Sequence, residues 1–225
     1  MNFKNLFRRT PAYSGAHSGK KSSAAAPLLV SFGIGHPRFT PRRYDHLAEE
    51  GFQKNIVAYR AVRLVAQNAA ATHWNVYSVK GAEKIKLYDH PLVTLLQRPN
   101  PVQGGAELFE SLYSFFLIAG NSYIEGNGSY GVAPTELWTL RPDRMRVIPG
   151  PGGVPEAYRY EINGQKYDFH VDAETQRSRV LHIKSFHPLD DWYGMSPLEA
   201  AAVSIDQHND AAKWNASLLQ AGGRP

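Results

Sequence analysis

The residue types best suited to chemistry gather in one short segment: His182, His187, Asp190 and Asp191. Imidazole and carboxylate groups are ligands that zinc takes in proteins, so this segment is a candidate metal site. A regular strand alternates its faces, however, and would point His182 and His187, five residues apart, in opposite directions. Asp190 and Asp191 precede Trp192 in a stretch typical of a turn. We therefore expect a strand end and a loop, with no metal ion or other cofactor; an enzyme with a His/Asp site is the alternative.

Two other kinds of catalytic site can be tested against the sequence. The segment Gly-Ala-His-Ser-Gly-Lys-Lys at 15–21 is the nearest approach to a phosphate-binding loop. That loop needs four residues between its glycines and a Ser or Thr after the lysine, whereas here there are three and a second lysine. The chain has no cysteine and no Gly-x-Ser-x-Gly motif, which excludes thiolate nucleophiles and the nucleophile elbow of hydrolases. The residues therefore predict a protein that is not an enzyme.

Charge divides the chain into a basic arm and a mildly acidic body. The first 44 residues contain eight basic and no acidic residues, so the net charge of +5 leaves −3 on the remainder. Residues 12–27 have few large apolar groups to bury, and we expect 1–44 to be a flexible arm. Such an arm is a candidate contact for nucleic acid or an acidic partner, and the alternative is a solvated tail with no dedicated partner. Its basic residues are Lys4, Arg8, Arg9, Lys20, Lys21, Arg38, Arg42 and Arg43.

The body, residues 45–225, has the periodicity of an α+β fold made of helices and antiparallel β hairpins. Asn163-Gly164 is a strong hairpin signal, and Gly120 is well placed to end a helix. No apolar run approaches the ~20 residues of a membrane span. We expect helices at 53–72, 92–97, 105–119 and 197–220, and strands at 74–79, 85–88, 122–125, 136–140, 144–148, 157–162, 165–169 and 180–186.

The last predicted helix has a clear start. Ser196 is a candidate N-cap, Pro197 fits the first helical position, and Glu199 completes a capping box. One face of the helix is narrow and mostly small-sided, which would let another helix or subunit approach closely. We expect a subunit interface at Leu198, Ala202, Ile205, Ala212 and Trp214. The sequence ends soon after this helix, so we also expect further protein beyond residue 225.

Several segments, taken together and in order, resemble the portal proteins of tailed phages of the HK97 type, including those of gene transfer agents and prophages. The resemblance covers about residues 45–225 and leaves the arm outside. The matching segments are Tyr-Arg-Ala-Val at 59–62 through Ala-Ala at 69–70, His-Pro-Leu at 90–92 through Arg-Pro-Asn-Pro at 98–101, Leu-Ile-Ala-Gly-Asn-Ser-Tyr at 117–123, Leu-Trp-Thr-Leu-Arg-Pro-Asp-Arg-Met at 137–145, His-Ile at 182–183 and Tyr-Gly-Met-Ser-Pro-Leu-Glu-Ala-Ala at 193–201.

The resemblance implies a structural subunit of a homo-oligomeric ring, usually a dodecamer, at one vertex of a capsid. Double-stranded DNA would pass through the ring, and the large terminase, a head–tail adaptor and the major capsid protein would bind it. It implies no catalytic activity and no membrane, a location in a virion or virus-like particle, and assembly in the bacterial cytoplasm. Residues 45–225 would be the N-terminal part of a portal wing, with the stem and clip beyond residue 225. The alternative is a nucleic-acid-binding module that acts through the basic arm.

Overall fold

The computed structural model describes residues 28–30, 38–40, 43–128 and 132–222. Helices and antiparallel sheets make up this part of the chain, which confirms the predicted α+β fold. The helices are α1 Tyr44–His46, the π-helical turn η2 Leu47–Gln53, α2 Ile56–Ala70, α3 Pro91–Gln97, α4 Gly105–Ala119, the short 3₁₀ turns η3 Pro142–Arg144 and η4 Pro151–Gly153, α5 Pro197–Ala200 and α6 Ala202–Gln220.

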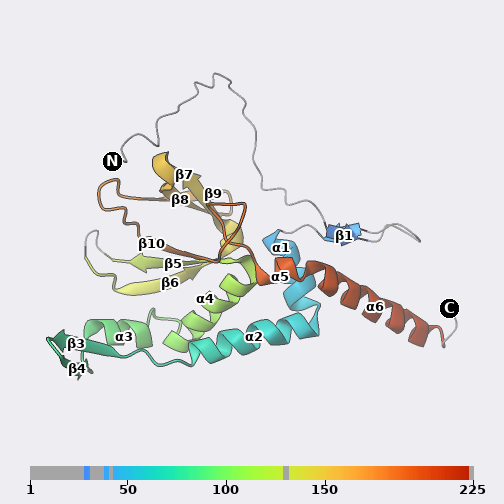
Figure 1. The fold of residues 1–225 in the computed structure, drawn as a ribbon, viewed down its shortest axis with the longest axis horizontal. Coiled ribbons are helices and arrows are strands. Elements are labelled where there is room, and N and C mark those ends of the chain that lie inside the picture. The colour runs from blue at the N-terminus through green and yellow to red at the C-terminus, as the bar shows by residue number, and fades with distance from the viewer. Residues whose placement is uncertain (1–27, 31–37, 41–42, 129–131, 223–225) are drawn as a thin grey trace, which may run out of the picture.

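The strands form two larger sheets and two smaller antiparallel pairs. The central sheet has the order β10-β5-β6, and the outer sheet has the order β7-β8-β9. In Figure 1 the outer sheet lies above the central sheet, and α4 and α2 lie below it. The strands are β1 Leu28–Val30, β2 Arg38–Thr40, β3 Val76–Lys80, β4 Glu83–Leu87, β5 Asn121–Asn127, β6 Glu136–Leu140, β7 Met145–Pro149, β8 Pro155–Ile162, β9 Gln165–His170 and β10 Val180–Lys184.

Alternation along the central strands gives this sheet two apolar faces. Ile124 and Ile183 face α4, where they pack with its buried Leu108. Tyr123, which is only 1% exposed, points the opposite way and packs with Met145 of the outer sheet. The central sheet is therefore covered on both sides and fixes the two other layers against each other.

A third cluster joins the helices to one another, through Leu47, Ala58, Val62, Ile118, Leu198 and Ile205. The start of α2 strengthens this joint. The Asn55 Oδ1 accepts hydrogen bonds from the N–H groups of Val57 and Ala58 at 3.1 and 3.0 Å, which caps the helix. The Asn55 Nδ2 also donates to Asn209 Oδ1 of α6 at 3.0 Å. One buried side chain thus caps α2 and ties the base of α6 to it.

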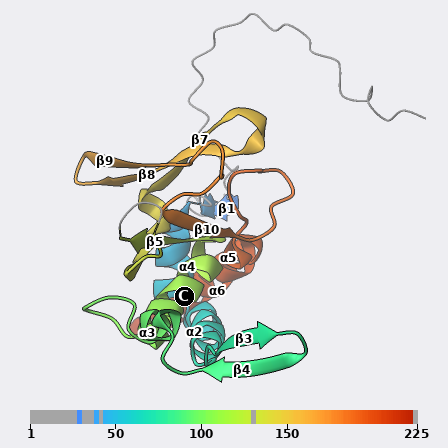
Figure 2. The same cartoon turned by 90° about the vertical axis from the view of Figure 1, so that its left-hand side faces the viewer.

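The two ends of the molecule differ in structure. The β3–β4 hairpin and α3 form one end, on either side of the base in the end-on view of Figure 2. At the other end, α6 projects away from the body (Figure 1). The predicted turn at Asn163-Gly164 is confirmed, since both residues have positive φ, 50° and 78°, as a tight hairpin turn requires.

Several predicted bounds are corrected by the structure. Before residue 43 only residues 28–30 and 38–40 are described, where β1 and β2 pair antiparallel and lie near α6; the flexible arm expected at 1–44 stays a prediction. Their Leu-Leu-Val and Arg-Phe-Thr sequences contain the β-branched and aromatic types that favour strands. The helix expected at 197–220 is divided at Ala201 into α5 and α6. The strand expected to reach Phe186 ends at Lys184, where its partner β5 begins at Asn121, directly after the left-handed Gly120 that ends α4.

Candidate functional site

An apolar groove opens between the central sheet and the helices α3 and α4. Its volume is about 970 Å³, and its walls come from both the helices and the sheet. The Trp74 ring packs on Phe109 at 5.4 Å between ring centroids and closes one side. The apolar residues that define the groove are Trp74, Leu92, Leu96, Phe109, Leu112, Tyr113, Ile124, Leu137, Leu181 and Ile183.

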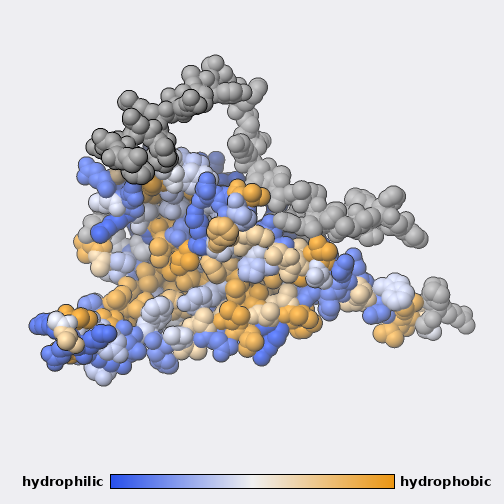
Figure 3. All heavy atoms as spheres, in the orientation of Figure 1, coloured by the Kyte–Doolittle hydropathy of each residue, from blue (hydrophilic) through white to orange (hydrophobic). Residues whose placement is uncertain are grey.

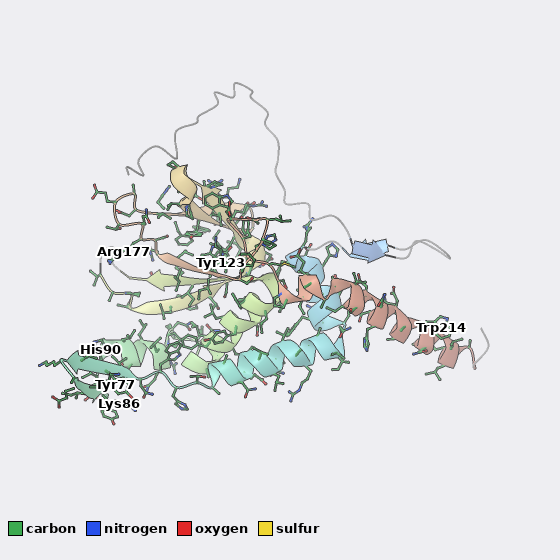
Figure 4. The ribbon with its side chains drawn as sticks, in the orientation of Figure 1. Tyr77, Lys86, His90, Tyr123, Arg177 and Trp214 are labelled. Atoms are coloured by element: carbon green, nitrogen blue, oxygen red, sulfur yellow. The ribbon has the colours of Figure 1, made fainter. Side chains whose placement is uncertain are left out.

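The mouth of the groove is polar and carries two arginines from the segment before β10. The Arg179 guanidinium lies 3.6 Å from the Glu125 carboxylate and donates a hydrogen bond to Asn127 Oδ1 at 2.9 Å, which holds it at the rim. Asp172 organises the adjoining turn, where its Oδ1 accepts a hydrogen bond from the Thr175 N–H at 2.7 Å. Arg177 is exposed at this end of the molecule (Figure 4). An apolar floor with a basic rim can bind an apolar segment that ends in negative charge.

Two helices present further apolar surface. α2 is buried along Ala58, Val62 and Ala66, yet much of the rest of its circumference is also apolar. Because a helix that is apolar on two sides is normally covered on two sides, this outward surface lacks a cover within the described chain. We call it the α2 stripe; Figure 3 shows apolar side chains gathered over this region, and its residues are Ile56, Val57, Leu64 and Val65, all between 47% and 69% exposed.

The outer half of α6 is the other exposed surface. Burial along α6 stops at Asn209, and between residues 210 and 220 only Leu218 is as much as half-buried. Trp214 is 62% exposed and Leu219 is 82% exposed. Figure 4 places Trp214 far from Arg177, at the opposite end of the long axis.

Close to the middle of the molecule, a buried polar joint connects β5 to the loop before α5. The Asn121 Oδ1 accepts a hydrogen bond from the Gly194 N–H at 2.7 Å, and its Nδ2 donates to the carbonyls of Gly194 and Ala119 at 3.1 and 2.9 Å. Ser196 accepts from the Leu198 N–H at 3.0 Å, which confirms the predicted N-cap. Its hydroxyl also donates to the Leu117 carbonyl at 3.1 Å. We call Gly120, Asn121, His182, Gly194 and Ser196 the junction.

His182 belongs to this junction. Its Nε2 lies 3.0 Å from Asn121 Oδ1, and because the Asn121 Nδ2 faces two carbonyls, the oxygen is the acceptor and the imidazole donates. The ring also stacks on Tyr123, with 4.3 Å between centroids. Burial and, secondarily, the charge of Lys184 lower the pKa of His182 to about 4, so the ring is neutral at pH 7.

The other members of the segment considered as a candidate metal site have local roles. The His187 Nδ1 accepts from the Leu189 N–H at 3.0 Å, and Asp190 caps the turn by accepting from the Trp192 and Tyr193 N–H groups. The Asp191 carbonyl accepts from Lys184. Within the described residues no group of three or more His, Asp or Glu side chains is placed to hold a metal ion. The strand end and loop expected from the sequence are what the structure contains.

The predicted subunit-interface residues divide into two sets. Leu198, Ala202 and Ile205 are buried in the chain's own core, and Leu198 and Ile205 contact the cluster that includes Leu47. Their apolar spacing therefore reflects packing inside one subunit, which corrects the expectation that they face another. Ala212 and Trp214 are exposed, and their assignment to an interface stays a prediction.

The basic arm can be placed only in part. Arg43 is exposed and lies 3.3 Å from Asp45, and Arg38 lies in β2. The contact predicted for the remaining residues falls outside the described part of the chain; they are Lys4, Arg8, Arg9, Lys20, Lys21 and Arg42.

Comparison with known proteins decides what kind of protein has these surfaces. The family model described as phage portal protein matches residues 56–225. The chain belongs to the phage portal protein family. Proteins of Rickettsia bellii and Rickettsia felis, both described as uncharacterized, are 39% and 38% identical to it, over 78% of this chain and 44% of theirs. The chain therefore spans about half the length of these relatives.

Solved structures agree with the portal family. The neck of an empty gene transfer agent particle, computed with sixfold symmetry, contains a chain with 41% identity and a TM-score of 0.71. The neck of a native particle, computed with twelvefold symmetry, contains one with 40% identity and a TM-score of 0.69. This chain is covered to 86% in both, and about half of each of those chains is matched. The portal family is a family of structural proteins, and no described helix here is long and apolar enough to cross a membrane.

Sequence reasoning found the junction segments but missed the groove and the α2 stripe. The groove is built from residues between 74 and 183 that have no common local pattern. The α2 stripe had a partial signal, since Val57 and Leu64 are seven residues apart and lie on the side away from Val62, whereas Val65 lies close to the buried side.

Proposed function

We propose that this portal-family chain is a structural subunit of a ring at a capsid vertex, of the kind that gene transfer agent particles contain. The observation that carries the proposal is the likeness to chains in the necks of such particles, one of them computed with twelvefold symmetry, at about 40% identity. In this role the ring is a dodecamer, and double-stranded DNA passes through it during packaging and ejection. The large terminase, a head–tail adaptor and the major capsid protein bind it in turn.

The surfaces of the chain suit such a role. A ring repeats one heterologous contact, in which two different surfaces of neighbouring subunits meet. The exposed α6 end, the α2 stripe and the apolar groove supply apolar surface of the kind that oligomer interfaces bury. The net charge of −3 after residue 44 also limits the attraction between the body and DNA phosphates, which sliding DNA requires.

The proposal is tested by purifying the complete gene product that contains this chain. Negative-stain images should show rings with a central hole, and native mass spectrometry should give a mass of twelve subunits. Assembly of the subunit occurs in the bacterial cytoplasm, so the recombinant protein expressed there should form the same rings. A protein that stays monomeric from low to high salt would contradict the proposal.

A second candidate function rests on the basic arm, whose first 44 residues carry eight basic residues and no acidic one. We propose it as a nucleic-acid contact, with affinity that falls steeply as the salt concentration rises. Deleting residues 1–27 removes five of the eight basic residues and leaves every element of the described fold in place. Unchanged DNA affinity in that variant would assign the arm another role.

A further inference from the structure

The β3–β4 hairpin carries a basic, aromatic surface at one end of the molecule (Figures 1 and 4). In its register Tyr77 lies opposite Lys86, and Val79 lies opposite Lys84. Because side chains alternate along a strand, these four share one face. Tyr88 follows β4, and the Lys86 Nζ lies over its ring, 5.1 Å from the centroid. We call Tyr77, Val79, Lys84, Lys86 and Tyr88 the hairpin face.

The hairpin face is the uncovered side of the hairpin. Tyr77, Val79 and Tyr88 are 50%, 61% and 72% exposed, and both lysines of the face are exposed as well. Within the described residues, neither lysine forms an ion pair. The half-buried residues of the two strands lie on the opposite face; they are Val76, Ser78 and Leu87. The hairpin face thus presents aromatic rings and two positive charges to a binding partner.

The charge of this face differs from that of the body. Residues 76–87 carry three lysines and one glutamate, whereas residues 45–225 as a whole carry a net charge of −3. The glutamate, Glu83, pairs with Lys80 in the register and lies on the opposite face from Lys84 and Lys86. It therefore adds no negative charge to the hairpin face, which is a local positive surface suited to a polyanion.

We propose that the hairpin face binds the phosphate backbone of double-stranded DNA, independently of base sequence. This inference rests on the proposed function, because that role brings the subunit to duplex DNA. A two-stranded β-ribbon is narrow enough to enter the major groove, which is about 12 Å wide. Lysine and tyrosine side chains are among those that contact DNA phosphates. Two lysines per subunit give a weak, salt-sensitive contact, which lets the DNA move.

The residues of the hairpin face favour nucleic acid over a protein partner. Lysine is depleted in protein–protein interfaces relative to the rest of the surface, whereas it is a main source of phosphate contacts. A partner strand could instead add to the outer edge of β4, because β4 is an edge strand of a two-stranded sheet. Lysines on an edge strand oppose such pairing, and Lys84 and Lys86 are two of the five residues of β4. A DNA backbone uses the same two lysines as ligands.

Fluorescence anisotropy of a short labelled duplex of random sequence tests the contact, with the complete gene product and a series of salt concentrations. Lys84→Ala/Lys86→Ala removes two phosphate contacts, so the slope of log affinity against log salt should become shallower by about 1.8. Over the decade from about 1 M to about 0.1 M salt, that change in slope predicts binding at least about tenfold weaker at the lower salt. Lys84→Arg/Lys86→Arg keeps both charges and should bind at least as tightly as the unmodified protein. A comparable loss in this arginine variant would overturn the inference.

The matched control is Arg146→Ala/Lys166→Ala, which removes the same charge from two exposed positions of the outer sheet. The central sheet separates these positions from the hairpin (Figure 2), so the control should weaken binding less than about threefold. Equal losses in the two double variants would overturn the inference, because the attraction would then follow net charge alone. Repeating both variants without residues 1–27 keeps the arm from masking the result.

A second measurement shows which side of the hairpin meets DNA. The chain has no cysteine, so Val79→Cys and Ile85→Cys each introduce one thiol, at positions 61% and 47% exposed on opposite faces of the hairpin. Saturating duplex DNA should slow maleimide labelling of the Val79→Cys thiol at least about twofold and leave that of Ile85→Cys unchanged. Protection of the Ile85→Cys thiol instead, or of neither thiol, would overturn the assignment of the face.

Two further outcomes separate this inference from its alternatives. Polyglutamate that displaces the labelled duplex as well as unlabelled DNA does, at equal charge concentration, would assign the hairpin face to an acidic protein segment and overturn the inference. Rings whose DNA affinity is unchanged by Lys84→Ala/Lys86→Ala would also overturn it, and would leave the proposed function standing. A monomeric gene product whose DNA affinity falls as expected in that variant would refute the ring and support the hairpin contact.

Discussion

The junction offers a sharp test of how this subunit holds its shape, through the substitution Asn121→Ala. The Asn121 side chain is the partner of the Gly194 N–H at 2.7 Å, of the Gly194 and Ala119 carbonyls, and of His182 Nε2 at 3.0 Å. Gly194 is buried, so its N–H group would have no water to bind once the amide is removed. Each buried group left without a partner costs about 1–3 kcal/mol. Counting the Gly194 N–H and the His182 ring, we expect the free energy of unfolding to fall by about 2–6 kcal/mol.

The assay is equilibrium unfolding in urea, followed by tryptophan fluorescence and by far-ultraviolet circular dichroism. Asn127→Ala is the matched control: Asn127 lies at the other end of β5, is exposed, and donates only to Glu136 at 3.2 Å and accepts from Arg179. It should cost no more than about 0.5 kcal/mol. Suppose that Asn121→Ala lowered the free energy of unfolding no more than this control, with an unchanged dependence of that free energy on urea concentration. The junction would then not hold the loop, and the reasoning would be refuted.

Three further predictions concern single positions. The pKa of His182 is lowered from 6.5 to about 4 by burial, so the unfolded chain binds a proton before the folded one does; stability should therefore fall by up to about 3 kcal/mol as the pH drops from 6.5 to 4, and a urea titration at each pH should show a smaller loss for His182→Gln. Gly120→Ala would place a methyl group 2.5 Å from the Gly194 carbonyl oxygen, at a φ of 70°. In the control Gly164→Ala, φ is 78° but nothing lies within 4 Å, and the free energy of unfolding should fall by about 1 kcal/mol. The loss for Gly120→Ala should be well above that, and melting temperatures of the two variants measure the difference. Leu108 of α4 is fully buried against the central sheet, so Leu108→Ala should lower the free energy of unfolding by about 3 kcal/mol. A loss below about 1 kcal/mol, measured by urea unfolding, would contradict the described packing.

Local signals in the sequence predicted the elements that local chemistry determines. The helix at 105–119 begins where the Gly104 N–H binds the Glu107 carboxylate at 2.9 Å and ends at Gly120, whose φ of 70° suits glycine. The Asn163-Gly164 turn follows the same rule. In contrast, the apolar spacing of Ile205 indicated a covered side but could not show what covers it. In the structure, Ile205 packs in the chain's own core, in a cluster that includes Leu47 of η2. The predicted elements did not include η2, so this cover was not foreseen.

The groove could not have been predicted by such reasoning. Trp74, Phe109 and Leu181 line one groove although they lie far apart in the sequence, and each is flanked by a different local pattern. A residue that lines an interface also has the same apolar type as one that lines a core, so composition does not separate the two. The exposed fraction of a side chain in the folded subunit is the quantity that separates them.

The segments that carry the resemblance to portal proteins turn out to contact one another in pairs. The Leu137 N–H donates to the Pro99 carbonyl at 2.7 Å, and the Leu137 carbonyl accepts from Asn100 Nδ2 at 3.0 Å. The segments at 117–123 and 193–201 meet at the junction, through Asn121 and Gly194. These motifs therefore maintain the arrangement of the layers.

This arrangement bears on the size of the proposed ring. The junction fixes the start of α5 against the central sheet, α6 follows directly, and the sheet forms a wall of the groove. The junction thus sets the angle between α6 and the central sheet. A twelvefold ring turns by about 30° per subunit and a thirteenfold ring by about 28°, so an error of about 2° changes the number of subunits. Close backbone packing at Gly120 and the amide pairing of Asn121 with Gly194 supply the rigidity that such a tolerance demands, because neither contact allows gradual sliding. Loss of stability and a spread of ring sizes should therefore appear together when Asn121 is truncated.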